Sequence, residues 1–281
     1  MRFGVAAAAL AALTLAAPAA AQQDALEVLR DAMEQLARNT EGVDDYTLTL
    51  RAGGLRTSAY VFREGDTWDV AGPDDGEVNE LMRSVVLWPL FSAMVADFPD
   101  PDEMSEDALE EWGDGFVLAA ETLDGRRVHA LSMNLDGLVD EDGSEMPDSV
   151  RLFVDTQTRQ ILRMYMGGLL ADMAEISPTS GEVAMTMDFR DYRETDGVTV
   201  PRRLRLDMRM DLGLTAEQRM MMQAGIQAAR AEAAADDSAE GRETVAVIDL
   251  FMGLIADGHL AMDVDVEDVQ VNTGPPAWLD N

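Results

Sequence analysis

The sequence predicts an α+β fold, with a single antiparallel sheet whose apolar face is covered by helices. Several segments alternate apolar and polar residues, as strands with one buried face do. Other segments place apolar residues three and four positions apart, which is typical of helices that bury one face. Strand, helix and strand never alternate as a parallel sheet requires, so an antiparallel sheet with helices on its apolar face is the economical arrangement.

The first half of the chain predicts a helix, a set of hairpins and a broken helical region. Residues 24–38 repeat leucine and methionine at helical spacing and end at Gly42. Segments 46–51, 57–63 and 68–70 alternate and are separated by glycine turns, which indicates a meander of hairpins. Residues 77–98 carry a wide apolar stripe interrupted at Pro89, so we expect two helical pieces there.

The second half predicts more strands, two helices and a last strand. Alternation or β-rich composition predicts strands at 116–122, 127–133, 150–155, 160–166, 183–190, 203–212 and 260–267. The polar faces of 183–190 and 203–212 carry both Arg and Asp, which could pair across the two strands. Thr215 and Gln218 form a capping-box pattern before a helix that reaches Ala235, and a second helix is expected at 244–255.

The composition excludes several classes of protein. The chain has 281 residues, a net charge of −33 and no cysteine, and all 21 basic residues are arginine. Disulfides and cysteine-bound metals are therefore impossible, and binding to nucleic acid is disfavoured because phosphates need a basic surface. The acidic runs at 97–111 and 136–148 lack the spacing of a calcium loop, so we expect no metal site and no cofactor.

The N-terminus predicts export. A short basic start is followed by an apolar run over 5–17, Pro18 and three alanines before Gln22, which is the pattern of a cleaved secretory signal peptide over 1–21. We expect the mature chain, 22–281, to be periplasmic and to form one domain with a helical insertion at about 215–256. Without cysteine it is not lipid-anchored, and we expect a monomer.

No sequence motif predicts an active site. The motifs of serine hydrolases, zinc proteases and P-loop enzymes are absent. The only histidines, His129 and His259, fall in or beside predicted strands without a recognisable partner. With 54 acidic residues, a carboxylate pair that could serve a glycosidase carries no information.

Methionine is the unusual feature, with 19 in the chain. Alternation places many of them on one sheet face, and a helix with Met220, Met221 and Met222 is a candidate cover for that face. Methionine is flexible and polarizable and suits a deformable apolar cavity, although it is also an ordinary filler of cores. We expect this wall to hold Met164, Met166, Met185, Met187, Phe189, Leu204, Leu206, Met208, Met210 and Met262, with Trp88, Phe91 and Met94 as lid candidates.

Three stretches resemble one family. The opening helix runs into GVDDYTLTL at 42–50, VDTQT at 154–158 leads into ILRM at 161–164, and 189–201 reads FRDYRETDGVTVP. Together they resemble the LolA/LolB-like superfamily of periplasmic carriers that sort outer-membrane lipoproteins. The resemblance implies an unclosed antiparallel half-barrel around an apolar cavity that holds acyl chains under a helical lid. The predicted helical pair at 215–255 departs from the smaller carriers.

Three functional hypotheses remain at this point. The first is a non-enzymatic periplasmic carrier or sensor of lipid or lipoprotein acyl chains, with membrane-associated donor and acceptor proteins as partners. The second is a structural or interaction module whose apolar face is simply its core. The third is a hydrolase with an unrecognised carboxylate pair.

Overall fold

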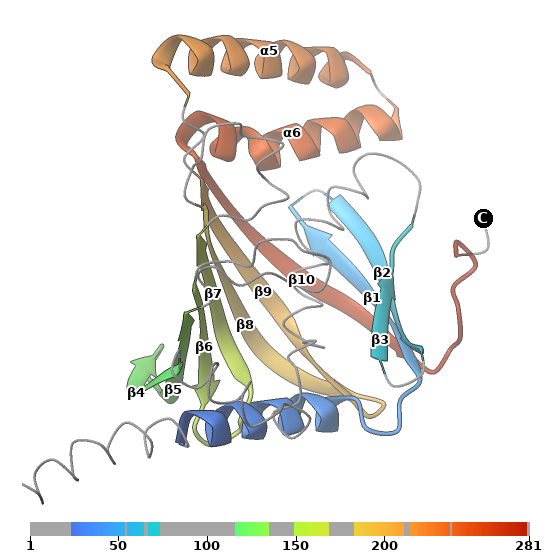
Figure 1. Ribbon diagram of the computed structural model, residues 1–281. Coiled ribbons are helices and arrows are strands. Elements are labelled where there is room, and N and C mark those ends of the chain that lie inside the picture. Colours follow the sequence, from blue (N-terminus) through green and yellow to red (C-terminus); the bar gives the residue numbers. More distant parts are fainter. Residues whose placement is uncertain are drawn as a thin grey trace, which may run out of the picture.

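A computed structural model describes residues 24–53, 55–64, 67–73, 116–134, 149–168, 183–210, 214–236 and 238–279. Its strands form one antiparallel sheet of 10 strands in the order β3-β2-β1-β10-β9-β8-β7-β6-β5-β4 (Figure 1). The strands are β1 Asp45–Ala52, β2 Leu55–Glu64, β3 Thr67–Ala71, β4 Phe116–Leu123, β5 Arg126–Asn134, β6 Ser149–Asp155, β7 Ile161–Gly168, β8 Val183–Thr195, β9 Val198–Met210 and β10 His259–Val271. Since β3 and β4 both end the sheet, it does not close into a barrel, and the predicted α+β half-barrel is confirmed.

Neighbouring strands follow the chain except at one place, where the last strand inserts beside the first. β10 pairs with β1 on one side and β9 on the other, which brings 45–52 against 259–271. The hairpin between β8 and β9 turns at Asp196 and Gly197, whose φ angles are 49° and 92°. Two left-handed residues make the turn that matches the twist of adjacent strands, and Asp-Gly is a preferred pair for it.

The described helices lie close to the expected ranges. The N-terminal helix covers 24–39, α5 runs over Ala216–Ala235 and α6 over Ala239–Asp257. Thr215 caps α5, with both hydrogen bonds of the predicted capping box present. α6 begins before the expected residue 244 because Ser238 acts as a cap: its hydroxyl accepts a hydrogen bond from the Gly241 N–H at 3.0 Å.

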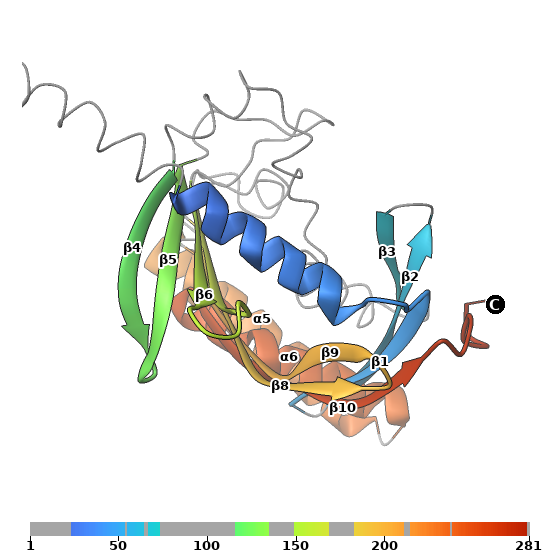
Figure 2. The same ribbon diagram turned by 90° about the horizontal axis from the view of Figure 1, so that it is seen from below.

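The sheet is curled, and its concave face forms the main core (Figure 2). Along β9, for example, Leu204, Leu206 and Met208 are buried on this face while Arg203 and Arg205 point to the other. The N-terminal helix crosses the concave face and buries Val28, Leu29 and Leu36 against it. The alternation read from the sequence therefore assigns the buried side correctly.

The other two helices do not cover the concave face. α6 lies across the end of the sheet near the start of β10, and α5 stacks on α6 away from the strands (Figure 1). α5 buries none of its residues. In the part of the chain that the structure describes, no helix is long and apolar enough to cross a membrane.

Candidate functional site

The concave face carries a contiguous group of methionines on four neighbouring strands. We define the methionine patch as Met164, Met166, Met185, Met187, Met208, Met210 and Met262. Strand register sets Met166, Met185 and Met208 side by side across β7, β8 and β9. The adjoining row contains Met164 and Met187, with Met262 separated from Met187 by Leu206 on β9. The patch is therefore a property of register as well as of composition.

The patch occupies the end of the sheet next to α6. Met210 closes β9, and its N–H donates to the Gly258 carbonyl at 2.8 Å, where α6 turns into β10. The N-terminal helix is attached at the opposite end of these strands, at the turn between β6 and β7. There Asn39 and Gln160 exchange two amide hydrogen bonds of 3.1 Å, and both side chains are buried.

The predicted wall residues lie together in the main core. Met164, Met185, Met187, Met208 and Met262 are each 4% exposed. Four further predicted residues of the wall are equally buried on the same face: Phe189, Leu204, Leu206 and Met210. Met166 is partly buried and packs against this core. Trp88, Phe91 and Met94 lie outside the described residues, as do the predicted signal peptide and the acidic runs.

The expected methionine cover on α5 is wrong. Met220 and Met221 are 65% and 61% exposed, and α5 contacts α6 rather than the sheet. The physical reason is that α6, with the greater apolar content, packs against the sheet end through Ala246 and Val247. Only one of the two helices can pack directly against the end of the sheet, so α5 lies on the outer side of α6.

A cavity of about 740 Å³ lies elsewhere, among the ends of the hairpins. Leu123 and Leu162 contribute apolar surface to it, whereas Asp124, Arg126 and Asp191 contribute charge. Its lining is thus mixed and contains none of the methionine patch. It is a different feature from the apolar cavity that the sequence predicts.

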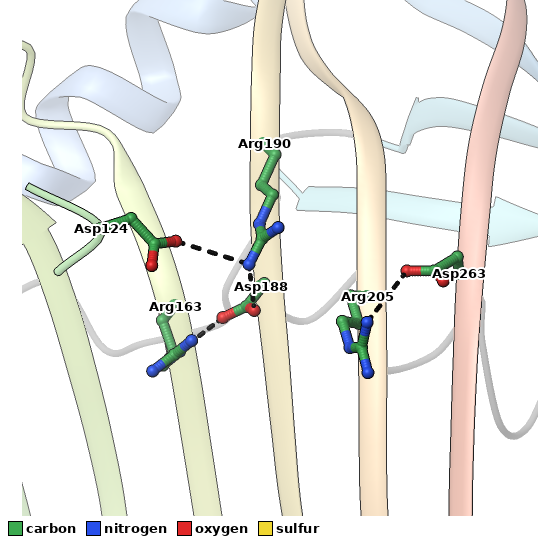
Figure 3. Close-up of polar contacts among 6 residues, drawn as sticks. All are labelled: Asp124, Arg163, Asp188, Arg190, Arg205 and Asp263. Atoms are coloured by element: carbon green, nitrogen blue, oxygen red, sulfur yellow. Dashed lines mark hydrogen bonds and ion pairs between the residues drawn. The ribbon is translucent and has the colours of Figure 1, made fainter.

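The convex face carries arginine–carboxylate pairs (Figure 3). Asp188 lies opposite Arg205 in the β8–β9 register, as the predicted cross-strand pairing requires. Asp188 instead pairs with Arg163 on β7 and with Arg190, 3.0 Å away on its own strand. Arg205 pairs with Asp263 on β10, 3.9 Å away. Long guanidinium side chains reach the strand on either side, so alternation alone does not select the partner.

The two histidines lie on strands that are far apart in the sheet order, His259 in β10 and His129 in β5. His259 Nε2 lies 3.1 Å from an Asp207 carboxylate oxygen on the neighbouring strand, at a half-exposed site. His129 lies in β5 and is half-buried. Within the described ranges, no cluster of three or more histidine, aspartate or glutamate side chains could hold a metal ion.

Two tyrosines were not singled out by the sequence. Tyr46 in β1 is completely buried in a T-shaped contact with Trp68, and its hydroxyl has no hydrogen-bond partner among the residues that the structure describes. Tyr192 in β8 donates its hydroxyl to the Ile161 carbonyl at 2.7 Å. Burial raises the pKa of both phenols above their ordinary value. Alternation predicts that Tyr46 points inward, but no sequence signal indicates that its hydroxyl lacks a partner.

The sequence matches no protein-family model, and no curated protein matches it. Solved structures align over most of the chain. An outer membrane lipoprotein-sorting protein domain from Vibrio parahaemolyticus is 13% identical, with a TM-score of 0.44 and coverage of 91% of this chain and 95% of that one. A DUF1329 family protein from Desulfovibrio piger is 12% identical, with a TM-score of 0.36 over 91% and 95% of the chains. A LolA superfamily protein from Nitrosomonas europaea is 8% identical, with a TM-score of 0.33 over 87% and 93%.

Proposed function

We propose that the protein is a non-enzymatic periplasmic carrier or sensor that binds the acyl chains of a lipid or lipoprotein against its concave face. The observation that carries the proposal is the methionine patch, which places seven flexible, polarizable side chains on one continuous apolar wall. Cores that specify one packing generally use leucine, isoleucine and valine instead. A wall of methionines adapts to apolar chains of different shape.

The driving force is apolar transfer. Each buried methylene contributes about 0.8 kcal/mol, so a chain of about twelve carbons contributes ~10 kcal/mol before the cost of association. Binding requires no directional chemistry. The rate of cargo release is then set by the movement that exposes the apolar wall. The predicted wall residues Phe189, Leu204 and Leu206 extend the methionine patch, and the lid candidates Trp88, Phe91 and Met94 would cover it.

The net charge of the protein determines which partners the carrier can approach when it holds its cargo. A net charge of −33 repels anionic lipid surfaces. The cargo is therefore collected from, and delivered to, membrane-associated proteins rather than the bilayer itself. The predicted signal peptide places these events in the periplasm.

Uptake of a fluorescent fatty acid by delipidated protein tests the proposal. We expect saturable, stoichiometric binding that Met208→Glu abolishes, because a carboxylate on the wall repels the chain or must be desolvated beside it. Met221→Glu is the matched control: the same substitution on exposed α5 should leave uptake unchanged. Circular dichroism verifies that both variants are folded.

A measurement without substitutions covers the case in which Met208→Glu fails to fold. With methionine methyl groups labelled for NMR, the fatty acid should shift the resonances of the methionine patch and leave those of exposed Met220 and Met221 in place. The deep burial of the patch also suits the second hypothesis, a module with a filled core. That hypothesis predicts no uptake and no shifts, and either result would remove the carrier.

A further inference from the structure

The two edges of the sheet differ in how well they are protected against pairing with another strand. β3 ends one edge with 5 residues, and the Val70 N–H on it already donates to the Asp69 carboxylate at 2.7 Å. β4 ends the other edge with 8 residues, Phe116–Leu123. Unprotected edges accept further strands because their N–H and C=O groups have no partner.

The hairpin between β4 and β5 shows which groups of β4 point outward. Its two turn residues, Asp124 and Gly125, have φ angles of 48° and 80°, and Leu123 pairs with Arg126 beside them. In such a two-residue hairpin the closing pair is hydrogen-bonded, and bonded pairs then alternate along the ladder. The N–H and C=O groups of Leu118, Ala120 and Thr122 therefore point away from β5.

The composition of β4 does nothing to deter pairing at this edge. It contains no proline, glycine, lysine or arginine, which are residues that interrupt or guard edge strands. Its single charge, Glu121, forms an ion pair with Arg151 on β6. Val117 is a large apolar residue that is 63% exposed. No described strand pairs with this outer edge.

We propose that the outer edge of β4 binds an extended, basic segment of a partner protein, which adds to the sheet as a further strand. The net charge of −33 selects the occupant. A second copy of the chain carries the same charge and is repelled, whereas a basic segment is attracted over a long range. Backbone hydrogen bonds supply the pairing. Asp124 at the end of β4 already pairs with Arg190 at 3.4 Å, so the attraction for a basic segment comes from the charge of the whole chain rather than from this carboxylate.

The test uses a blocked peptide that alternates arginine and valine over seven residues, and a control peptide in which the backbone nitrogens of all seven residues are methylated, so that neither edge of the control can donate. The two have the same charge, but the control cannot pair as a strand. We expect the full-length protein to bind the first peptide at least tenfold more tightly, since the control loses several backbone hydrogen bonds. Amide exchange at Leu118, Ala120 and Thr122 should slow only with the first peptide.

Ala120→Pro locates the site. It removes an outward N–H without removing a bond to β5, so we expect about tenfold weaker binding of the alternating peptide. Ala120→Val, which keeps the N–H, should bind as the parent does. Equal binding of both peptides, or no binding, would overturn the proposal, as would protection of amides at another edge. A dimer that Ala120→Pro dissociates would show that a second copy, not a basic partner, occupies β4.

Discussion

Replacing Tyr46 with phenylalanine is expected to stabilise the protein, whereas the same change at Tyr192 is expected to destabilise it. The two hydroxyl groups differ in their hydrogen bonding, and Tyr46 is the more deeply buried of the two residues. The Tyr46 hydroxyl is buried with no hydrogen-bond partner in the described part of the chain, while the Tyr192 hydroxyl donates to the Ile161 carbonyl at 2.7 Å. The substitution removes one oxygen in each case, so the pair compares the loss of an unpaired hydroxyl with the loss of a hydrogen-bonded one.

The size of the effect follows from the cost of burying an unpaired polar group. Leaving a buried donor unsatisfied costs ~1–3 kcal/mol, and a formed hydrogen bond contributes ~0.5–1.5 kcal/mol. Removing the Tyr46 oxygen recovers the first cost, less a small penalty for the void it leaves. We therefore expect a gain of about 1 kcal/mol for Tyr46→Phe and a loss of about 1 kcal/mol for Tyr192→Phe.

Urea unfolding followed by circular dichroism measures both changes, provided that the denaturant dependence stays constant among the variants. Equal losses in the two variants would refute the reasoning, because they would show that the Tyr46 hydroxyl is as well paired in solution as that of Tyr192. Tyr60→Phe can be measured as a third variant, because Tyr60 lies on the opposite face of the β1–β2 hairpin from Tyr46, where its ring stacks on Phe62.

Three further predictions concern pH, α5 and the attachment of the N-terminal helix. Burial raises the pKa of Tyr46 and Tyr192 in the folded state. The free energy of unfolding should therefore fall above about pH 10, where unfolded tyrosine ionises, by up to ~1.4 kcal/mol per pH unit for each residue. Each Phe variant should make this fall with pH less steep. Thr215→Ala removes the cap of α5 and should speed amide exchange within α5, at a local cost of ~1 kcal/mol, while exchange in the sheet is unchanged. Asn39→Ala leaves the buried Gln160 amide unpaired and should cost ~1–3 kcal/mol in urea unfolding, and a double-mutant cycle with Gln160→Ala should recover part of it.

Alternation in the sequence was enough to place most strands and their buried faces. In 183–189 and 204–210 every second residue is apolar, and a period of two assigns those residues to one face whatever the neighbouring strand. The capping box at Thr215 was equally local, since all its atoms lie within four residues. Features set by short stretches of chain can be predicted from those stretches.

Features that depend on which other segment a stretch of chain contacts could not be predicted in the same way. Alternation does not indicate that β10 inserts between β1 and β9, nor that Arg205 pairs with Asp263 rather than Asp188. The exposure of α5 depends on α6 packing first against the sheet end. The candidate site has the same limit: the sequence predicts that Met185 and Met208 point inward, but not whether the volume in front of them is filled.

The charge of the chain and the stability of its fold are separate matters. Arg205 and Asp263 form an ion pair on the convex face with largely exposed side chains, where such a pair contributes at most about 1 kcal/mol. The concave face owes its stability to apolar side chains, so added salt should weaken the surface pairs without unfolding the sheet. The net charge of −33 therefore matters for partners: it disfavours contact with anionic surfaces, and at the proposed β4 site it favours a basic strand over a second copy of the chain.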